Sequence, residues 1–183
     1  MKSIYAWAKM LIFVMVGALS LTSCDKDEMK ASNLDGTWEG NFFMFYETND
    51  GVRTKRWMAD YTVLEFVNTP FTNYGKGYQI DYFTSTYGKP GGCPIPEQFS
   101  YFKWEINDGN ITLVYEDRAY LNTVIYDYHM SRTSFYGSIG DSMNQFTMTK
   151  VENYDWGTYQ SYIDTYYYAK PRANAEADSI SAE

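Results

Sequence analysis

The side chains in this chain that could carry out chemistry are few. His129 is the only histidine, so a Ser-His-Asp or Cys-His arrangement could be built only around it. The sequence has no Gly-x-Ser-x-Gly turn that would hold a nucleophilic serine. His129 falls on the same face of its predicted strand as Ile125 and Asp127, opposite two tyrosines, and we expect it to point outward. The sequence therefore predicts no catalysis by histidine.

Paired carboxylates could hydrolyse a glycosidic bond. The predicted strands carry these acidic residues: Glu39, Glu65, Asp81, Glu105 and Asp127. The last four alternate with apolar neighbours as solvent-facing residues do, so we expect them at the surface. A metal site would need several His, Cys or carboxylate ligands at suitable spacing, and the sequence offers none. We predict a protein without enzymatic activity, cofactor or metal.

The stretch Leu21-Thr22-Ser23-Cys24 ends a short apolar run with small residues and a cysteine. Lys2 and Lys9 make the beginning of the chain basic. The apolar residues 10–19 are too few to cross a bilayer as a helix, which takes about 20 residues. This pattern is typical of a bacterial lipoprotein signal. It favours lipidation of Cys24 over an ordinary secretory signal or a single membrane-spanning anchor.

We therefore predict a signal peptide over residues 1–23, a lipidated acidic tether over residues 24–33 and a single domain after it. The signal holds two of the 15 basic residues and none of the 23 acidic ones, so the mature chain carries a formal charge of about −10. Such an acidic surface argues against binding of nucleic acid and against electrostatic docking on anionic lipid. The membrane contact that we expect is the acylated Cys24.

Aromatic residues make up 19% of the chain, and they favour strands. Alternating apolar positions separated by turn residues predict eight strands, at 37–46, 57–67, 77–84, 99–107, 111–115, 122–130, 134–139 and 144–151. The short connections predict an antiparallel meander. Closure into an all-β, eight-stranded up-and-down barrel removes both edges of this sheet, and a β-sandwich is the alternative.

The first predicted strand opens with Leu34-Asp35-Gly36-Thr37-Trp38-Glu39-Gly40, which contains a Gly-x-Trp sequence. This resembles the opening of lipocalin-like domains, and the resemblance implies that Trp38 closes one end of a barrel. Through further patterns such as Trp104-Glu105-Ile106, residues 34–151 resemble the small lipocalin-like lipoproteins of the Bacteroidota.

The segment Asp25-Lys26-Asp27-Glu28 resembles the export signal that sends lipoproteins of that group to the cell surface. The resemblance implies an outer-membrane lipoprotein that is exposed on the cell surface. An orientation that faces the periplasm is the alternative.

The connection from Ser85 to Gln98 contains three prolines and three glycines, so it cannot extend either flanking strand. Connections of this length are more often functional than merely linking. We expect a lid over an open barrel end, with a surface excursion as the alternative. Cys93, which has only Lys89 as a basic neighbour, is predicted to be an inert thiol. The predicted ligand-binding residues are Tyr87, Ile95, Tyr78, Tyr82 and Trp104.

A second concentration of aromatic residues follows the last strand, from Tyr154 to Tyr168, and Tyr159, Tyr162 and Tyr166 have helical spacing. Such side chains stack on sugars or on a protein partner, but a segment that packs against the barrel has the same composition. The predicted lipocalin-like domain includes this segment and spans residues 34–168. We expect residues 169–183 to be disordered.

These features predict a lipid-anchored binding module for a small apolar or aromatic ligand or a glycan segment. The alternative is an interaction protein with a solid barrel that contacts another envelope protein. Packing distinguishes the two: a barrel filled by Trp38, Phe66, Trp104 and Phe146 leaves no room for a ligand and favours the interaction protein.

Overall fold

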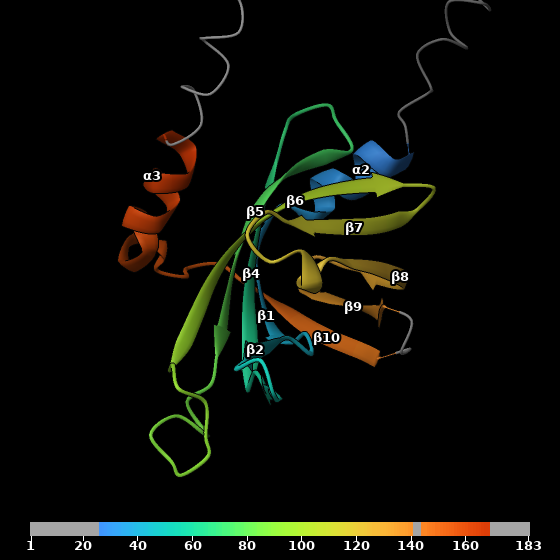
Figure 1. Cartoon of the computed structure of the whole chain (residues 1–183). Coiled ribbons are helices and arrows are strands. Elements are labelled where there is room, and N and C mark those ends of the chain that lie inside the picture. Colours follow the sequence, from blue (N-terminus) through green and yellow to red (C-terminus); the bar gives the residue numbers. More distant parts are fainter. Residues whose placement is uncertain (1–25, 141–143, 169–183) are drawn as a thin grey trace, which may run out of the picture.

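The computed structural model describes residues 26–140 and 144–168 (Figure 1). The predicted signal peptide, Cys24 and the tail at 169–183 lie outside these residues. The elements in chain order are α2 (Lys26–Leu34), β1 (Gly36–Asn41), β2 (Phe45–Asn49), β3 (Thr54–Met58), β4 (Tyr61–Asn68), β5 (Tyr74–Tyr82), β6 (Glu97–Asn107), β7 (Asn110–Tyr115), the 3-10 turn η1 (Ala119–Leu121), β8 (Thr123–Met130), β9 (Ser134–Ile139), β10 (Asn144–Val151), the 3-10 turn η2 (Trp156–Tyr159) and α3 (Gln160–Tyr168).

Eight of the strands form a closed antiparallel barrel in the order β1-β10-β9-β8-β7-β6-β5-β4. Each strand pairs with its neighbour in the chain, and β1 closes the barrel by pairing with β4 and β10. This confirms the up-and-down barrel and rules out the sandwich. An eight-stranded antiparallel barrel of this topology is consistent with a lipocalin-like fold.

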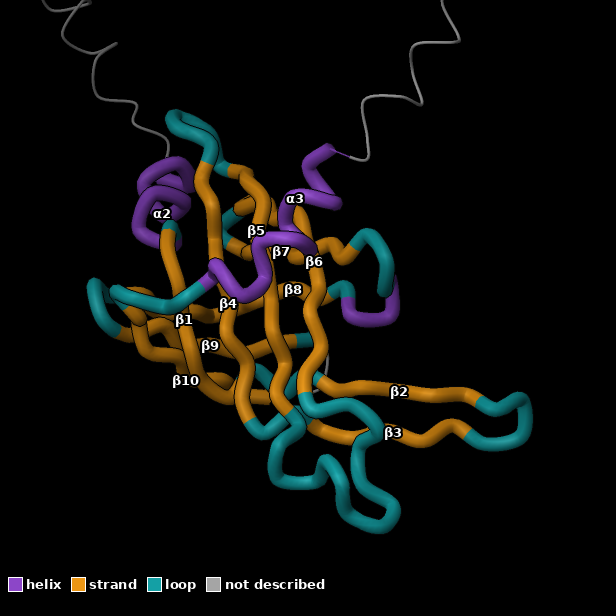
Figure 2. The backbone as a smooth tube through the Cα atoms, turned by 90° about the vertical axis from the view of Figure 1, so that its left-hand side faces the viewer, coloured by secondary structure: helices purple, strands orange, loops and turns teal. Residues whose placement is uncertain are grey.

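The strands predicted at 37–46 and 57–67 are each divided in two. β1 ends at Asn41, and the chain then leaves the barrel as the hairpin of β2 and β3 before it returns as β4. Figure 2 shows this hairpin projecting from the barrel. At its base Phe42, Met44 and Leu121 are buried and fill the barrel end from which the hairpin leaves.

The opposite end of the barrel is covered by α2. Ala31 and Leu34 on this helix are fully buried, and the indole Nε1 of Trp38 donates a hydrogen bond to the Leu34 carbonyl oxygen at 2.8 Å. Trp38 therefore lies at this closed end, as the resemblance implied. The segment predicted as a tether at 24–33 therefore contributes to the core, because Ala31 belongs to the buried cluster with Leu34 and Trp38.

The interior of the barrel is filled mainly by aromatic and aliphatic side chains. Trp38, Phe66, Trp104 and Phe146 are each exposed by no more than 2%. Edge-to-face contacts join them through neighbouring rings, with centroids 5.6 Å apart for Trp38 and Phe135 and 5.9 Å apart for Phe66 and Trp104. Aromatic pairs favour this geometry. The four side chains named as the test of a solid barrel thus occupy its interior.

The polar side chains of β5 face the interior of the barrel. Gln79 lies opposite Leu64 and Asp81 opposite Thr62, and directly opposed residues share a face of the sheet. Gly77 continues this inward face, where a Cβ atom would collide with the Phe102 ring. The prediction that Asp81 faces solvent is wrong, because this side chain is fully buried.

Tyr78, Ile80 and Tyr82 consequently lie on the outer face of β5, where the C-terminal segment covers them. Tyr78 and Ile80 form a second buried cluster with Tyr159 and Ile163, which follow the barrel in the chain. The Tyr154 to Tyr168 segment therefore packs against the barrel, one of the two roles left open for it.

The β8 strand contains an irregularity between Tyr126 and His129, where Asp127 takes a φ of 47°. The strand changes face at this bulge. Ile125 is therefore buried in the core, whereas His129 is exposed and packs against Tyr136. The outward position of His129 is confirmed, but the expectation that Ile125 shares its face is wrong.

Candidate functional site

A groove of about 870 Å³ opens on the side of the barrel, where β6 extends beyond β7. The register explains this opening, since β7 pairs with β6 from Phe102 onward while β5 pairs with β6 from Glu97 to Glu105. Residues 97–101 thus pair with β5 but lie beyond the register of β7. The groove is lined by Tyr46, Ile95, Glu97, Gln98, Phe99, Ser100, Tyr101, Glu116, Asp117, Arg118, Tyr159, Tyr162 and Thr165.

Local hydrogen bonds end β7 and turn the chain back toward β6. The backbone N–H of Tyr115 donates to Asn122 Oδ1 at 2.8 Å, and that of Leu121 donates to the Arg118 carbonyl oxygen at 2.8 Å. This turn places Arg118 beside the part of β6 that β7 leaves unpaired. Its side chain takes the position that a continuing strand would occupy.

The Arg118 guanidinium binds the free edge of β6. Its Nη1 donates to the Phe99 carbonyl oxygen at 3.0 Å and to Ser100 Oγ at 2.6 Å. The Gln98 amide oxygen, in the orientation that satisfies both groups, accepts from the guanidinium at 2.6 to 2.9 Å. Gln98 and Ser100 face the interior of the barrel, so Arg118 connects the groove with the polar part of the core.

Behind Arg118 lies the buried Asp81 carboxyl group, which is hydrogen-bonded on both oxygens. Thr62 Oγ1 donates to Oδ1 and Gln79 Nε2 donates to Oδ2, each at 2.7 Å, and the Tyr115 hydroxyl donates to Gln79 Oε1 at 2.5 Å. Burial raises the pKa of Asp81 to about 6, although both hydrogen bonds and the charge of Arg118 act to lower it. Burial also raises the pKa of Tyr115, so its hydroxyl remains a donor.

Aromatic rings form the opposite wall of the groove. Phe99 stacks on Tyr159 with centroids 6.0 Å apart and on Tyr162 with centroids 5.5 Å apart. The Tyr159 hydroxyl donates to Glu97 Oε2 at 2.9 Å, and burial, with these contacts, raises its pKa. Tyr162 is 59% exposed, so α3 offers a ring with a free surface at the mouth of the groove.

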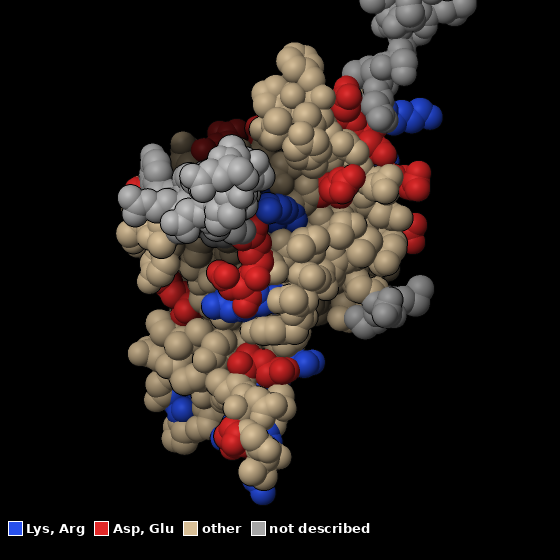
Figure 3. Space-filling model, turned by 45° about the horizontal axis from the view of Figure 1, so that its top comes forward, with Lys and Arg blue, Asp and Glu red and all other residues tan. Residues whose placement is uncertain are grey.

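Charged groups of both signs lie around these rings. Arg118 is accompanied by Glu97, Glu116 and Asp117, and Glu116 forms an ion pair of 2.8 Å with Lys103. In Figure 3 acidic and basic side chains lie next to one another near the middle of the view. The groove combines flat apolar surfaces with hydrogen-bonding groups, which suits the binding of a polar ligand.

The predicted ligand-binding residues do not converge on one place. Ile95 lines the groove. Tyr78 and Tyr82 lie beneath the C-terminal segment, Trp104 is inside the barrel, and Tyr87 is exposed on its loop. Tyr159 and Tyr162 are recognisable in the sequence by their helical spacing. Arg118 is not, because its only signal there is a single basic residue that follows Glu116 and Asp117 at the end of a strand.

The loop predicted to be a lid packs beside the β2–β3 hairpin. Trp57 Nε1 donates to the Gly91 carbonyl oxygen at 3.0 Å, and the backbone N–H of Ser85 donates to Asp60 Oδ2 at 2.7 Å. Cys93 is buried there, and burial raises the pKa of its thiol. A high pKa keeps a thiol protonated and a poor nucleophile.

The remaining strand acids lie apart from Asp81. Glu39, Glu105 and Asp127 are exposed. Glu65 is on the outer face, where Thr37 Oγ1 and Trp156 Nε1 donate to its Oε2, and burial raises its pKa. The exposed positions of Glu105 and Asp127 agree with the prediction. Because Glu65 and Asp81 lie on opposite faces of the sheet, they do not form a carboxylate pair.

Within residues 26–140 and 144–168 no group of three or more His, Cys, Asp or Glu side chains is placed to hold a metal ion. No helix in the described part of the chain has the length and apolar character needed to cross a membrane. No protein-family model matches the sequence, and no curated protein matches it either.

Proposed function

We propose that this protein is a lipid-anchored binding module of the cell envelope, and that it holds a glycan segment in the groove between β6 and α3. The exposed face of Tyr162 beside Arg118 and the groove carboxylates is the observation that carries this proposal. Sugars present both apolar faces and hydroxyl groups, and this wall of the groove offers partners for both. The filled interior leaves no room for a ligand inside the barrel and favours the interaction protein by the packing criterion, so the glycan site proposed here lies on the outer side of the barrel.

Removing the Tyr162 ring is expected to weaken binding of an oligosaccharide about 10-fold or more, which is the usual effect of truncating a central aromatic contact. The measurement is isothermal titration of the Cys24→Ser protein with neutral and acidic oligosaccharides. Tyr136→Ala is the matched control, because Tyr136 is an exposed tyrosine on β9 that does not line the groove. Equal affinities for Tyr162→Ala and Tyr136→Ala would contradict the proposed site.

A second candidate function is favoured by residues 97–100 of β6, which lie beyond the register of β7 and where the Arg118 side chain binds the Phe99 carbonyl oxygen. An extended segment of another protein that displaced the Arg118 side chain would continue the sheet at this edge. In this case the protein is an accessory subunit of another envelope protein. A photo-crosslinking group at Ile95 in cells would then capture one protein partner, while the oligosaccharides would give no heat of binding.

The lipid anchor is tested separately. Cys24→Ser should release the protein from the membrane fraction, because the acyl chains on Cys24 are its expected attachment. Its far-ultraviolet circular dichroism should match that of the wild type, since the described domain begins after this residue. Protease treatment of intact cells then distinguishes the proposed surface exposure from the periplasmic orientation. Unchanged membrane partitioning of Cys24→Ser contradicts the anchor.

A further inference from the structure

The turn between β4 and β5 presents an apolar side chain to solvent in a strained conformation. Phe71 at its tip is 92% exposed and has a φ of 62°. A bulky residue in the left-handed region costs free energy that glycine would avoid at this position. Neither hydrophobic burial nor backbone preference explains phenylalanine here, so the residue points to a contact made outside the domain.

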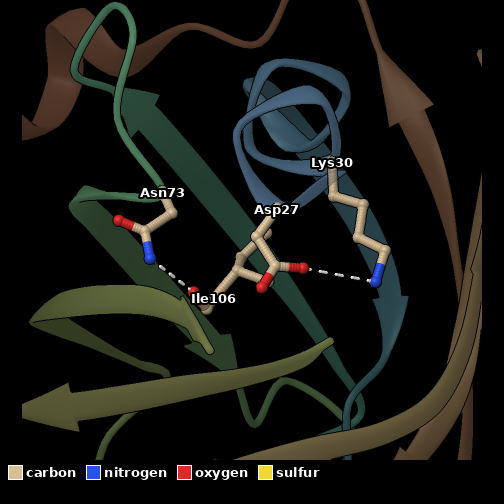
Figure 4. Close-up of polar contacts among 4 residues, drawn as sticks. All are labelled: Asp27, Lys30, Asn73 and Ile106. Carbon is tan, nitrogen blue, oxygen red and sulfur yellow. Dashed lines mark hydrogen bonds and ion pairs between the residues drawn. The ribbon is translucent and has the colours of Figure 1, made fainter. Parts of the chain in front are cut away.

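The turn is held firmly in place. Thr72 Oγ1 donates to the Thr69 carbonyl oxygen at 2.7 Å and to that of Tyr74 at 2.9 Å. Asn73 Nδ2 donates to the Ile106 carbonyl oxygen at 2.7 Å, as Figure 4 shows, and the N–H of Ile106 donates back to the Asn73 carbonyl oxygen at 2.7 Å. The barrel therefore presents Phe71 from a fixed base.

The turn lies next to α2 at the same end of the barrel. A depression of about 450 Å³ lies between them, with Met29 on α2 and with Pro70 and Phe71 on the turn among its lining residues. Met29 is itself 55% exposed. Figure 1 shows α2 and the β4–β5 turn together at one end, and the β2–β3 hairpin at the other.

The position of the proposed lipid attachment explains what this end faces. Helix α2 begins at Lys26, and Cys24 precedes it by two residues. Two residues of extended chain span at most about 7 Å. A lipid on Cys24 would hold the α2 end of the barrel against the membrane surface.

We propose that Phe71, with Met29 beside it, rests in the interfacial region of the bilayer that carries the acyl chains of Cys24. This inference rests on the lipid anchor of the proposed function. Glu28 and Asp35 line the depression, and Asp27 on the same helix forms an ion pair of 3.5 Å with Lys30 (Figure 4). The contact itself is apolar, and the acidic residues beside it would repel anionic lipids. It therefore suits neutral lipid headgroups. Two attachment points hold the barrel upright, with the hairpin directed away from the membrane.

The test places an environment-sensitive fluorophore on Phe71→Cys in the lipidated full-length protein, in a Cys93→Ser background, reconstituted in phosphatidylcholine vesicles. Emission should shift to the blue and be quenched by spin-labelled lipids. Val52→Cys is the matched control, because Val52 is 87% exposed at the hairpin tip. Its label should keep the emission of a water-exposed fluorophore.

Flotation of the vesicles separates the two proposals. A protein that fails to float lacks the anchor, which overturns this contact together with the lipid anchor. If the protein floats but the label at position 71 has the emission of a water-exposed fluorophore, the membrane contact of Phe71 is contradicted and the lipid anchor is not. Phe71→Gly adds a second readout: its Tm should rise because the backbone strain is relieved, while a label on Met29→Cys should move toward water. If the emission of the label at position 29 is the same with and without Phe71, then Phe71 does not hold this end in the bilayer.

Discussion

Replacing Trp38 with alanine is expected to lower the free energy of unfolding by about 3 to 5 kcal/mol, the usual cost of truncating a buried tryptophan. Trp38 is fully buried, packs on Phe135, and donates its indole N–H to the Leu34 carbonyl oxygen. Its loss leaves a cavity at the closed end and frees the last turn of α2. Urea denaturation followed by circular dichroism measures the change.

Two control variants define the origin of this effect. Trp38→Phe keeps an aromatic ring in the core but loses the hydrogen bond to Leu34, so its destabilisation should be smaller. His129→Ala should change stability by less than about 0.5 kcal/mol, as surface substitutions do. A loss for His129→Ala as large as that for Trp38→Ala would contradict the assigned faces of β1 and β8.

The second large effect concerns pH. The folded-state pKa of Asp81, about 6, lies above its ordinary value of 3.8, so the folded protein binds the proton more tightly than the unfolded chain. The stabilisation from this proton is complete below about pH 4 and is lost as the pH rises through 6. At 1.36 kcal/mol per pKa unit, the loss amounts to about 3 kcal/mol at pH 7.

Asp81→Asn should remove this dependence. The variant is expected to match the wild type near pH 4 and to exceed its stability at pH 7 by up to about 3 kcal/mol. The Gln79 amide can turn so that its oxygen accepts from the amide introduced by the substitution, while its Nε2 donates to the Tyr115 hydroxyl. Urea denaturation at several pH values between 4 and 8 gives the difference in the free energy of unfolding between the variant and the wild type as a function of pH.

Glu105→Gln serves as the control for charge, because Glu105 is a strand acid that lies exposed on β6. The difference curve of Asp81→Asn should depend on pH more steeply than that of Glu105→Gln. A flat curve for Asp81→Asn would mean that the buried carboxyl does not titrate in this range. A fall in stability at pH 7 would mean that the ionised group with Arg118 is net stabilising.

The proposed site on the side of the barrel would have a consequence for specificity. The groove lies between β6, the turn that carries Arg118, and α3, so its shape depends on how α3 packs on Phe99. The interior sites of hollow barrels depend instead on the strands themselves. Changes in the C-terminal segment should therefore alter ligand preference while the barrel remains folded.

Much of the architecture was readable from the chain. Alternation in Phe102, Trp104 and Ile106, and again in Ile111 and Leu113, identified paired strands and their inward faces, and the structure confirms both. In this part of β6 the alternate residues Lys103 and Glu105 are exposed, so the pattern follows burial directly. The Gly-x-Trp sequence likewise located Trp38 at a closed end.

The candidate site was only partly readable. Tyr159 and Tyr162 stood out by their helical spacing, and Ile95 by its place in a long loop. Arg118 and Glu97 show no pattern in the sequence. Arg118 reaches β6 because β7 ends at Tyr115, and Glu97 reaches Tyr159 because the C-terminal segment packs on the barrel. Both contacts join residues that are distant in the chain, and local sequence patterns do not show such contacts.

By itself, the sequence determined the number of barrel strands and their order, because local alternation and short turns specify an antiparallel meander. The closed end at Trp38 was implied by the resemblance to lipocalin-like domains. Only the tertiary structure decided which face of β5 is inside. Tyr78 and Tyr82 were predicted to bind a ligand, but together with Ile80 they lie on the outer face, where the C-terminal segment packs against them. Asp81 then points inward, where Thr62 and Gln79 satisfy it. Alternation shows that one face of a strand is buried, and what buries it depends on residues far away in the chain.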